Sequence, residues 1–235
     1  MLDYDEEATR YDATRGGEPR ARAAAEALLA LVPGSARTLL DLARGTGIVT
    51  RCLARPGLLP FGVDLADGML RAAAPRLDGA VARADCRQLP FRDRAFDAVT
   101  SIWLLHLIDD AAPVVAEAAR VLGPGGVYLT TVDKGAAHLV GSDLCAPAEP
   151  YRTRRPADAA ELITSYATGH GLRPRGRVTF VGHGQGRTPA RLARDVRAGR
   201  IYAAGGEGLA RRLEALPDQD TPRPDPAYTV LAFGR

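Results

Sequence analysis

The sequence of 235 residues predicts an α/β fold in which a mainly parallel β-sheet is covered by helices on both faces. Short apolar runs, typical of buried strands, alternate with longer segments whose apolar residues recur at helical spacing. The connections between them are short, as in βαβ units with right-handed crossovers. A turn with two glycines, Gly45 and Gly47, follows the first apolar run and leads into a helix-like segment. These three features together define the predicted fold class.

The expected strands are short apolar runs, and they cover residues 38–42, 59–63, 80–83, 96–103, 127–132, 177–181 and 227–233. The expected helices cover residues 19–31, 48–53, 67–75, 111–121, 158–168, 189–198 and 208–216. The first four of these helices end at proline or glycine, and the fourth is expected to be closed by the glycine-rich residues 123–126. Four prolines in residues 217–226 predict a surface connection.

The composition is typical of a soluble globular protein, with 46% apolar residues, 25% charged residues and a net charge of +3. Lys134 is the only lysine and the arginines are scattered, so a nucleic-acid interface, which needs clustered positive charge, is not expected. Three cysteines without a C-x-x-C pair predict neither a disulfide framework nor a zinc site. The acidic N-terminus and the lack of a long apolar run predict no signal peptide, no membrane span and a cytoplasmic location.

Acidic residues stand at the ends of the first three expected strands, as Asp41, Asp64 and Asp85. In an open α/β sheet, ligands bind beyond the carboxyl ends of the strands. Asp64 lies 17 positions after Gly47, near the distance at which an acidic residue reaches ribose hydroxyls in nucleotide-type sites. Helix N-capping is the alternative role for any one of these aspartates, and we prefer that role for Asp67. The set as a whole favours a ribose-containing ligand.

The glycine turn distinguishes between two classes of cofactor. Dinucleotide-binding folds use G-x-G-x-x-G, whose third glycine lets the helix pack closely on the strand. Thr50 stands at that third position here, which argues against a nicotinamide-dependent reductase. Asp41, directly before the turn, would repel a pyrophosphate but suits a cationic amine.

Four segments match a known family in sequence and in order. They are LLDLARGTG (39–47), VDLADGML (63–70), RADCRQLPFRDRAFDAVTSIWLLHLIDD (83–110) and EAARVLGPGGVYLTT (117–131). Together they resemble the motifs of the class I S-adenosylmethionine-dependent methyltransferases, whose first motif is written D-x-G-x-G-x-G. The small-molecule enzymes of the bacterial ubiquinone/menaquinone-type group are the nearest in pattern. The resemblance covers residues 38–132.

The resemblance implies a Rossmann-like, doubly wound sheet of seven strands, mostly parallel with the last strand antiparallel, under an N-terminal helical lid. It implies a single domain with an N-terminal cap (1–32), a cofactor-binding core (38–132) and substrate-side segments (133–235). The implied cofactor is S-adenosyl-L-methionine, with no metal ion. The implied reaction is methyl transfer to an O, N or C nucleophile of a small molecule, which we place in bacterial secondary metabolism.

The resemblance, carried over residue by residue, implies a role for each position. It implies that the turn lines the methionine portion of the cofactor, that Asp64 takes the ribose hydroxyls and that Asp85 receives the adenine amino group. Tyr11, with Tyr4 or Arg15 beside it, belongs to a segment that closes over the cofactor. The full set of implied cofactor-binding residues is Tyr11, Asp41, Ala43, Arg44, Gly45, Gly47, Asp64, Leu65, Met69, Asp85, Cys86, Ser101 and Ile102.

One position departs from the family's first motif, because Ala43 stands where its first glycine is usual. The Cβ of alanine restricts φ and crowds the loop, so cofactor affinity is either lowered or tolerant of one methyl group. Arg44 follows, and two roles are open for it. It pairs with the carboxylate of the cofactor, or it is a solvated surface arginine.

In-line methyl transfer needs a base only when the nucleophile arrives protonated. His106, directly after the fourth expected strand, is the candidate base, and a packing histidine is the alternative role. Lys134 directly follows the fifth expected strand, and we interpret it as a loop residue and not as a catalytic one. Two other functions stay open on the same cofactor-binding fold. One is cyclisation or rearrangement of a natural product, and the other is a non-catalytic binding module.

Overall fold

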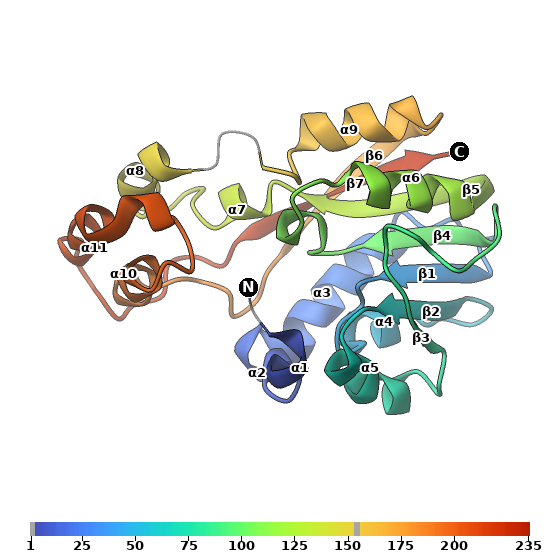
Figure 1. Ribbon diagram of the computed structural model, residues 1–235, viewed down its shortest axis with the longest axis horizontal. Coiled ribbons are helices and arrows are strands. Elements are labelled where there is room, and N and C mark those ends of the chain that lie inside the picture. Colours follow the sequence, from blue (N-terminus) through green and yellow to red (C-terminus); the bar gives the residue numbers. More distant parts are fainter. Residues whose placement is uncertain (1–2, 153–155) are drawn as a thin grey trace.

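The computed structural model describes residues 3–152 and 156–235, which form a β-sheet flanked by helices (Figure 1). Seven strands make up the sheet in these residues. They are β1 (Thr38–Leu42), β2 (Leu59–Asp64), β3 (Val81–Arg83), β4 (Phe96–Ser101), β5 (Leu122–Val132), β6 (Arg173–Val181) and β7 (Ala227–Gly234).

Eleven α-helices are present in the same described residues. They are α1 (Tyr4–Glu7), α2 (Tyr11–Thr14), α3 (Gly17–Leu29), α4 (Ile48–Cys52), α5 (Asp67–Ala73), α6 (Ala112–Val121), α7 (Lys134–Ala137), α8 (Cys145–Ala148), α9 (Ala160–Gly169), α10 (Pro189–Arg197) and α11 (Gly206–Glu214). Short 3-10 turns are formed by Ala74–Arg76, Leu105–Leu107, Glu149–Tyr151 and Ala203–Gly205.

The strands follow the order β3-β2-β1-β4-β5-β7-β6 across the sheet. β1 pairs in parallel with both β2 and β4, so the carboxyl ends of these three strands lie at one edge. β7 runs antiparallel between β5 and β6. The predicted Rossmann-like, doubly wound sheet with an antiparallel last strand is confirmed.

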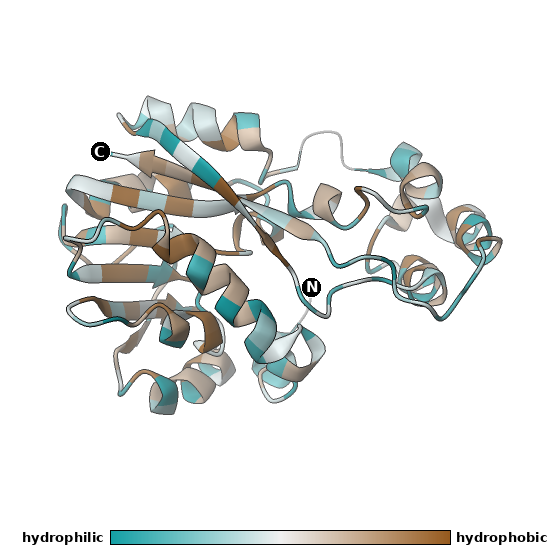
Figure 2. Ribbon diagram, turned by 180° about the vertical axis from the view of Figure 1, so that it is seen from behind, coloured by the Kyte–Doolittle hydropathy of each residue, from teal (hydrophilic) through white to brown (hydrophobic). Residues whose placement is uncertain are grey.

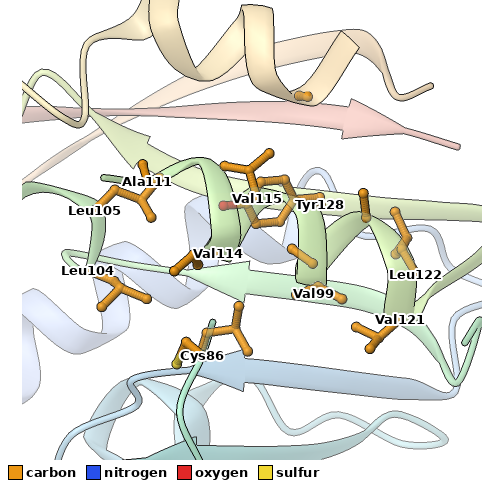
Figure 3. Packing of buried hydrophobic residues seen from close by; sticks show 14 of the residues in the cluster. Cys86, Val99, Leu104, Leu105, Ala111, Val114, Val115, Val121, Leu122 and Tyr128 are labelled. Atoms are coloured by element: carbon orange, nitrogen blue, oxygen red, sulfur yellow. The ribbon is translucent and has the colours of Figure 1, made fainter. Parts of the chain in front are cut away.

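Apolar side chains fill both faces of the sheet. On one face α6 and α9 pack over β4 and β5, where Val115 and Tyr128 are fully buried (Figure 3). On the other face α3 and α4 contribute Leu28 and Leu53, which are also fully buried. Full burial of such a side chain contributes about 1.5–3 kcal/mol. These two layers fix the positions of the strand ends that carry the site.

A third apolar cluster lies beside the sheet, where α8, α10 and α11 pack together (Figure 1). Leu144, Leu192 and Leu209 are fully buried in it. The sequence predicted α10 and α11 but neither α8 nor a separate cluster, because a four-residue helix is too short to show a helical period. Residues 182–188, named here the β6–α10 connection, link the sheet to this cluster.

Three strand boundaries differ from the prediction by more than one residue. β5 begins at Leu122 instead of residue 127, because Leu122 pairs with Phe96 before residues 123–126 interrupt the register. β6 begins at Arg173 instead of residue 177, and its exposed first residues are hydrophilic (Figure 2). β4 ends at Ser101 instead of Trp103, since Trp103 has a left-handed backbone with φ of 55°.

No helix in residues 3–152 and 156–235 is long and apolar enough to cross a membrane.

Candidate functional site

The glycine turn lies at the carboxyl edge of the sheet and is hydrogen-bonded to the end of β2. The Arg44 N–H donates to the Val63 carbonyl at 3.1 Å, and the Gly45 N–H donates to Asp64 Oδ2 at 2.8 Å. Gly45 and Gly47 adopt φ of 61° and 74°, which glycine allows without steric cost. The sequence therefore forms the expected turn, with its amide groups beside the carboxylate predicted to bind ribose.

Ala43 also adopts a left-handed backbone, with φ of 50°. For a residue with a Cβ this conformation costs roughly 1–2 kcal/mol. The turn thus keeps the backbone conformation that a glycine would adopt, and Ala43 is strained in that conformation. A non-glycine residue is expected to be disfavoured at position 43, and the left-handed φ of Ala43 is the physical reason.

Asp64 is buried and uses both carboxylate oxygens to order the loop. Oδ2 accepts from Gly45, and Oδ1 accepts from the Ala66 N–H at 3.0 Å. A carboxylate oxygen has two lone pairs, so each oxygen retains one acceptor position. The side chain is fixed in place and can still accept two further hydrogen bonds.

Asp41 is fully buried below the turn and does not reach its surface. It accepts hydrogen bonds from the hydroxyls of Thr50 at 2.5 Å and Thr100 at 2.7 Å. Burial raises the pKa of this carboxyl, and the two hydroxyls oppose that shift. Thr50, which replaces the third glycine of dinucleotide sites, therefore has a partner for its hydroxyl. Any effect of Asp41 on a bound ligand passes through the loop.

Arg44 is buried, so its interpretation as a solvated surface arginine is wrong. Its stem lies across Gly62, where an added Cβ would sit 1.8 Å from Arg44 Cδ. Nη1 donates to the Gly45 carbonyl at 3.1 Å, whereas Nε and Nη2 have no partner within the part of the chain that the structure describes. Burial lowers the pKa of this guanidinium, and Asp64 and Asp41 act in the opposite direction. The arginine thus supplies positive charge beneath the turn.

The expected adenine-side residues lie in different environments. Met69 is buried and Leu65 is exposed, whereas Cys86 is buried with its thiol pKa raised by burial to about 12. The Asp85 carboxylate is held by the Arg87 side chain at 2.7 Å, and this interaction lowers its pKa. Asp85 therefore has a competing partner at the protein surface.

The expected residues at the end of β4, Ser101 and Ile102, offer main-chain groups. The Ser101 hydroxyl is buried and lies 2.8 Å from the Tyr128 hydroxyl and 2.7 Å from Thr130 Oγ1. Ile102 is buried as well. The side chain of Ser101 is thus occupied inside the sheet, and a ligand can use only the backbone of this pair.

The N-terminal helices α1 and α2 cover the turn, as predicted for a lid. Asp5 Oδ1 accepts from the Gly68 N–H at 2.5 Å, which joins α1 to the start of α5. Asp12 accepts from the Thr46 hydroxyl at 2.6 Å and pairs with Arg76 at 2.7 Å, which joins α2 to the turn. The lid is therefore attached at two points that flank the predicted cofactor.

Tyr4 and Tyr11 lie on the inner side of this lid, with ring centroids 6.3 Å apart. Burial raises the pKa of Tyr4 to about 12, and the nearby charge of Asp64 acts in the same direction. The Arg15 guanidinium lies 5.7 Å from the centre of the Tyr11 ring. Of the predicted lid residues, Tyr4 thus lies near Asp64, and Tyr11 and Arg15 follow beside it.

Alanine in place of Gly68 is expected to open this lid. An added Cβ would lie 2.6 Å from the Asp5 carbonyl oxygen, so α1 has to move. Gly208 in α11 offers a matched control, because a Cβ there meets nothing within 4 Å. Hydrogen exchange of residues 3–15 should become at least tenfold faster in Gly68→Ala and stay unchanged in Gly208→Ala, which is expected to gain up to about 1 kcal/mol in stability. Equal exchange in both variants would contradict the attachment of α1 to α5.

His106 and Lys134 meet on the other side of the site. His106 lies in the 3-10 turn after β4, Lys134 begins α7 after β5, and His106 Nε2 is 2.8 Å from Lys134 Nζ. Burial, reinforced by nearby cations, lowers the pKa of His106 to about 2 and that of Lys134 to about 7. A general base works best when its pKa lies near the working pH. The lowered pKa values therefore make Lys134 the candidate proton acceptor of the pair, with His106 as its hydrogen-bond partner.

Sequence reasoning missed the surroundings of this pair. Arg20 in α3 is buried, and its guanidinium lies 3.8 Å from the centre of the Trp103 ring. Trp103 also contacts Phe180 and Tyr228, with ring centroids 5.8 and 5.5 Å away. The one available signal was the apolar strand end at Trp103, which did not indicate a cation on its ring. In the described residues, no three His, Cys, Asp or Glu side chains are grouped so as to hold a metal ion.

Comparison with known proteins gives a family match for part of the chain. Residues 40–130 match the family model described as a methyltransferase domain. A demethylmenaquinone methyltransferase of Mycolicibacterium paratuberculosis is 38% identical over 128 residues, which are 52% of this chain and 54% of the relative. The chain therefore spans about half the length of this curated relative.

Two solved structures resemble the whole chain. A SAM-dependent methyltransferase from Thermotoga maritima matches with a TM-score of 0.59 and 15% identity, over 98% of this chain and 97% of its own. The [4+2]-cyclase SpnF matches with a TM-score of 0.61 and 20% identity, over 99% and 94%. At these identities the two structures establish the fold alone.

Proposed function

We propose that the protein transfers a methyl group from S-adenosylmethionine to a small molecule, because residues 40–130 match the methyltransferase-domain family model. The observation that supports this proposal most directly is the position of Asp64. Its carboxylate orders the glycine turn and keeps one acceptor position on each oxygen. A ribose with two neighbouring hydroxyls fits those two positions.

The rest of the turn also fits the cofactor. A Cβ added at Gly45 would meet only Met69 Sδ, at 3.8 Å, so the backbone is approachable from that side. We assign the methionine portion to the turn, the ribose to Asp64 and the adenine to the space between Leu65, Met69 and the backbone of Cys86. Asp85 can bind the adenine only if its ion pair with Arg87 loosens. Exposed ion pairs of this kind contribute about 0–1 kcal/mol to stability.

Bound S-adenosylmethionine supplies an electrophilic methyl group on a sulfonium, and the chain supplies the position of the acceptor and the path of its proton. Lys134 Nζ in its neutral form takes the proton of an acceptor hydroxyl or amine. His106 Nε2, 2.8 Å from Lys134 Nζ, orients the amine group of the lysine. The lid of α1 and α2 excludes water from the reacting atoms. Alignment of this kind can lower the barrier by about 7–11 kcal/mol.

The residues that we expect to recognise the methyl acceptor lie outside the segment that the family model matches. The family model ends at residue 130, whereas Lys134 and the segments that follow it lie beyond that point. The curated relative is named for demethylmenaquinone, and it shares about half of its length with this chain. We therefore infer a bacterial small-molecule acceptor in secondary metabolism, read by residues of this chain's own C-terminal part.

Calorimetric titration with S-adenosylmethionine and S-adenosylhomocysteine tests the cofactor, and methyl-labelled cofactor tests the reaction. We expect saturable binding of both compounds and transfer of the label to an acceptor from extracts of the producing bacterium. Failure of both compounds to bind contradicts the proposal. Binding together with an unlabelled, rearranged product would instead support cyclisation chemistry on the same fold.

A further inference from the structure

The charges of three arginines, together with burial, lower the pKa of Lys134, so these arginines lie in its neighbourhood. Arg15 follows α2, Arg20 lies in α3 and Arg187 belongs to the β6–α10 connection. Within the residues that the structure describes, none of the three forms a salt bridge with a carboxylate. A buried or half-buried cation without a counter-ion is costly, so such a group calls for an explanation.

Packing of the N-terminal segment on the β6–α10 connection brings these arginines together. A Cβ at Gly16 would lie 1.9 Å from the His183 carbonyl oxygen, so the backbones of the two segments are in direct contact. Arg20 Nη1 lies 3.4 Å from Gln185 Oε1, two residues before Arg187. Residues separated by more than 160 positions in the chain thus form one wall of the site.

The carboxylates in this neighbourhood already have partners. Asp225 accepts the N–H groups of residues 184, 185 and 186 at 2.7–3.0 Å and so fixes the β6–α10 connection. Asp158 Oδ2 accepts the Lys134 backbone N–H at 2.9 Å. Both side chains serve main-chain amides, and the guanidinium groups are left without a carboxylate.

The wall contains hydrogen-bond donors in excess of acceptors. Arg20 is only 6% exposed and rests on the Trp103 ring, and the Trp103 indole Nε1 is buried with no partner in the described residues. An arginine or tryptophan side chain can donate but cannot accept. Burial and the charges of all three arginines lower the pKa of Lys134. The same three charges act to lower the pKa of Tyr228, against the effect of burial, so the guanidinium groups lie near both residues.

We propose that Arg15, Arg20 and Arg187 form an anion subsite, and that the methyl acceptor is a small molecule bearing a carboxylate or phosphate group. Guanidinium groups bind both anions in bidentate geometry and stay charged at any physiological pH. That the anion is the methyl acceptor rests on the proposed function, whereas the subsite rests on the packing of the N-terminal segment against the β6–α10 connection and on the shared effect of the three arginines on Lys134. An anion at this place is held within reach of the Lys134–His106 pair.

Because Lys134 is the only lysine, selective labelling of lysine gives one NMR signal inside the subsite. The protein loaded with S-adenosylhomocysteine is titrated with benzoate, phenyl phosphate and the neutral isostere benzamide. We expect saturable shifts of the signal, with a raised Lys134 pKa, for at least one anion and none for benzamide. A response to one anion alone assigns the subsite to that anion. No response to either, or an equal response to benzamide, overturns the proposal.

Arg187→Gln is expected to weaken binding of the responding anion at least tenfold, and Arg15→Gln is a second variant at a half-buried position. Arg191→Gln, on the exposed side of α10, is the matched control and should bind like the wild type. Thermal melting shows which variants are folded. Unchanged anion binding in both subsite variants overturns the proposal.

Calorimetry with S-adenosylhomocysteine distinguishes failure of the proposed function from failure of the anion subsite. Anion binding without cofactor binding contradicts the proposed function and leaves the subsite standing. Cofactor binding without anion binding contradicts the subsite alone.

Discussion

Alanine in place of Asp64 is expected to weaken binding of S-adenosylhomocysteine by about 10- to 100-fold. Hydrogen bonds to a charged group contribute about 1.5–3 kcal/mol, and about 1.4 kcal/mol corresponds to a factor of ten in affinity. The substitution removes the proposed acceptor of the ribose hydroxyls. It also removes the partner of the Gly45 N–H, which lies 2.8 Å from Asp64 Oδ2, so the turn loses its order at the same time. Calorimetric titration measures the loss.

Asp67→Ala is the matched control for this experiment. Asp67 lies three positions later and is exposed, and in the described residues its carboxylate pairs with the exposed Arg83 side chain alone, at 3.4 Å. We expect its affinity for S-adenosylhomocysteine to stay within twofold of the wild type. Asp64→Asn, which keeps one acceptor oxygen, should fall between the two. Equal losses in Asp64→Ala and Asp67→Ala would show that general charge, and not the placed carboxylate, attracts the ligand.

The cofactor side could be predicted because its residues are set by their own strands. A short apolar run, a glycine turn and an aspartate at the next strand end are local features, and parallel pairing then brings them to one edge. The inward direction of the Arg44 side chain could not be predicted from such local features. Its buried position depends on Gly62 of the neighbouring strand, whose missing side chain leaves room for the arginine stem.

The acceptor side depends on contacts between distant segments. Arg15, Arg20 and Arg187 look like scattered arginines in the sequence, and only the packing of Gly16 on the β6–α10 connection gathers them. The same limit applies to the start of β6. Its first residues are exposed and pair along an edge, so burial leaves no apolar signal there. Sequence patterns report burial within one element, and they carry little information on which surfaces meet.

Lys134 is expected to titrate near pH 7 in the folded protein, since burial and the three arginines lower its pKa from 10.5 to about 7. The same NMR signal should titrate near 10.5 after unfolding in urea. Asp158 opposes the shift, and His106 and His138 face the amine as neutral rings with pKa values of about 2. Between pH 7 and 10.5 the unfolded chain binds more protons than the folded one. The contribution of Lys134 to the free energy of unfolding therefore rises with pH across that window. A midpoint near 10.5 in the folded protein would contradict its burial.

Arginine at position 134 keeps the positive charge but cannot give up its proton near neutral pH. If Lys134 accepts the proton of the methyl acceptor, kcat should fall by about 100- to 10,000-fold, the range typical of general base catalysis. In the wild type kcat/KM should rise as the pH passes 7, and this rise should disappear in Lys134→Arg.

Calorimetry with S-adenosylhomocysteine separates chemistry from architecture in the Lys134→Arg variant. A loss of turnover with unchanged cofactor affinity places Lys134 at the reacting atoms, whereas a parallel loss of both would make it a structural residue. Wild-type turnover in the variant would mean that the acceptor arrives already deprotonated, and then the arginines around it, not a base, would govern the reaction.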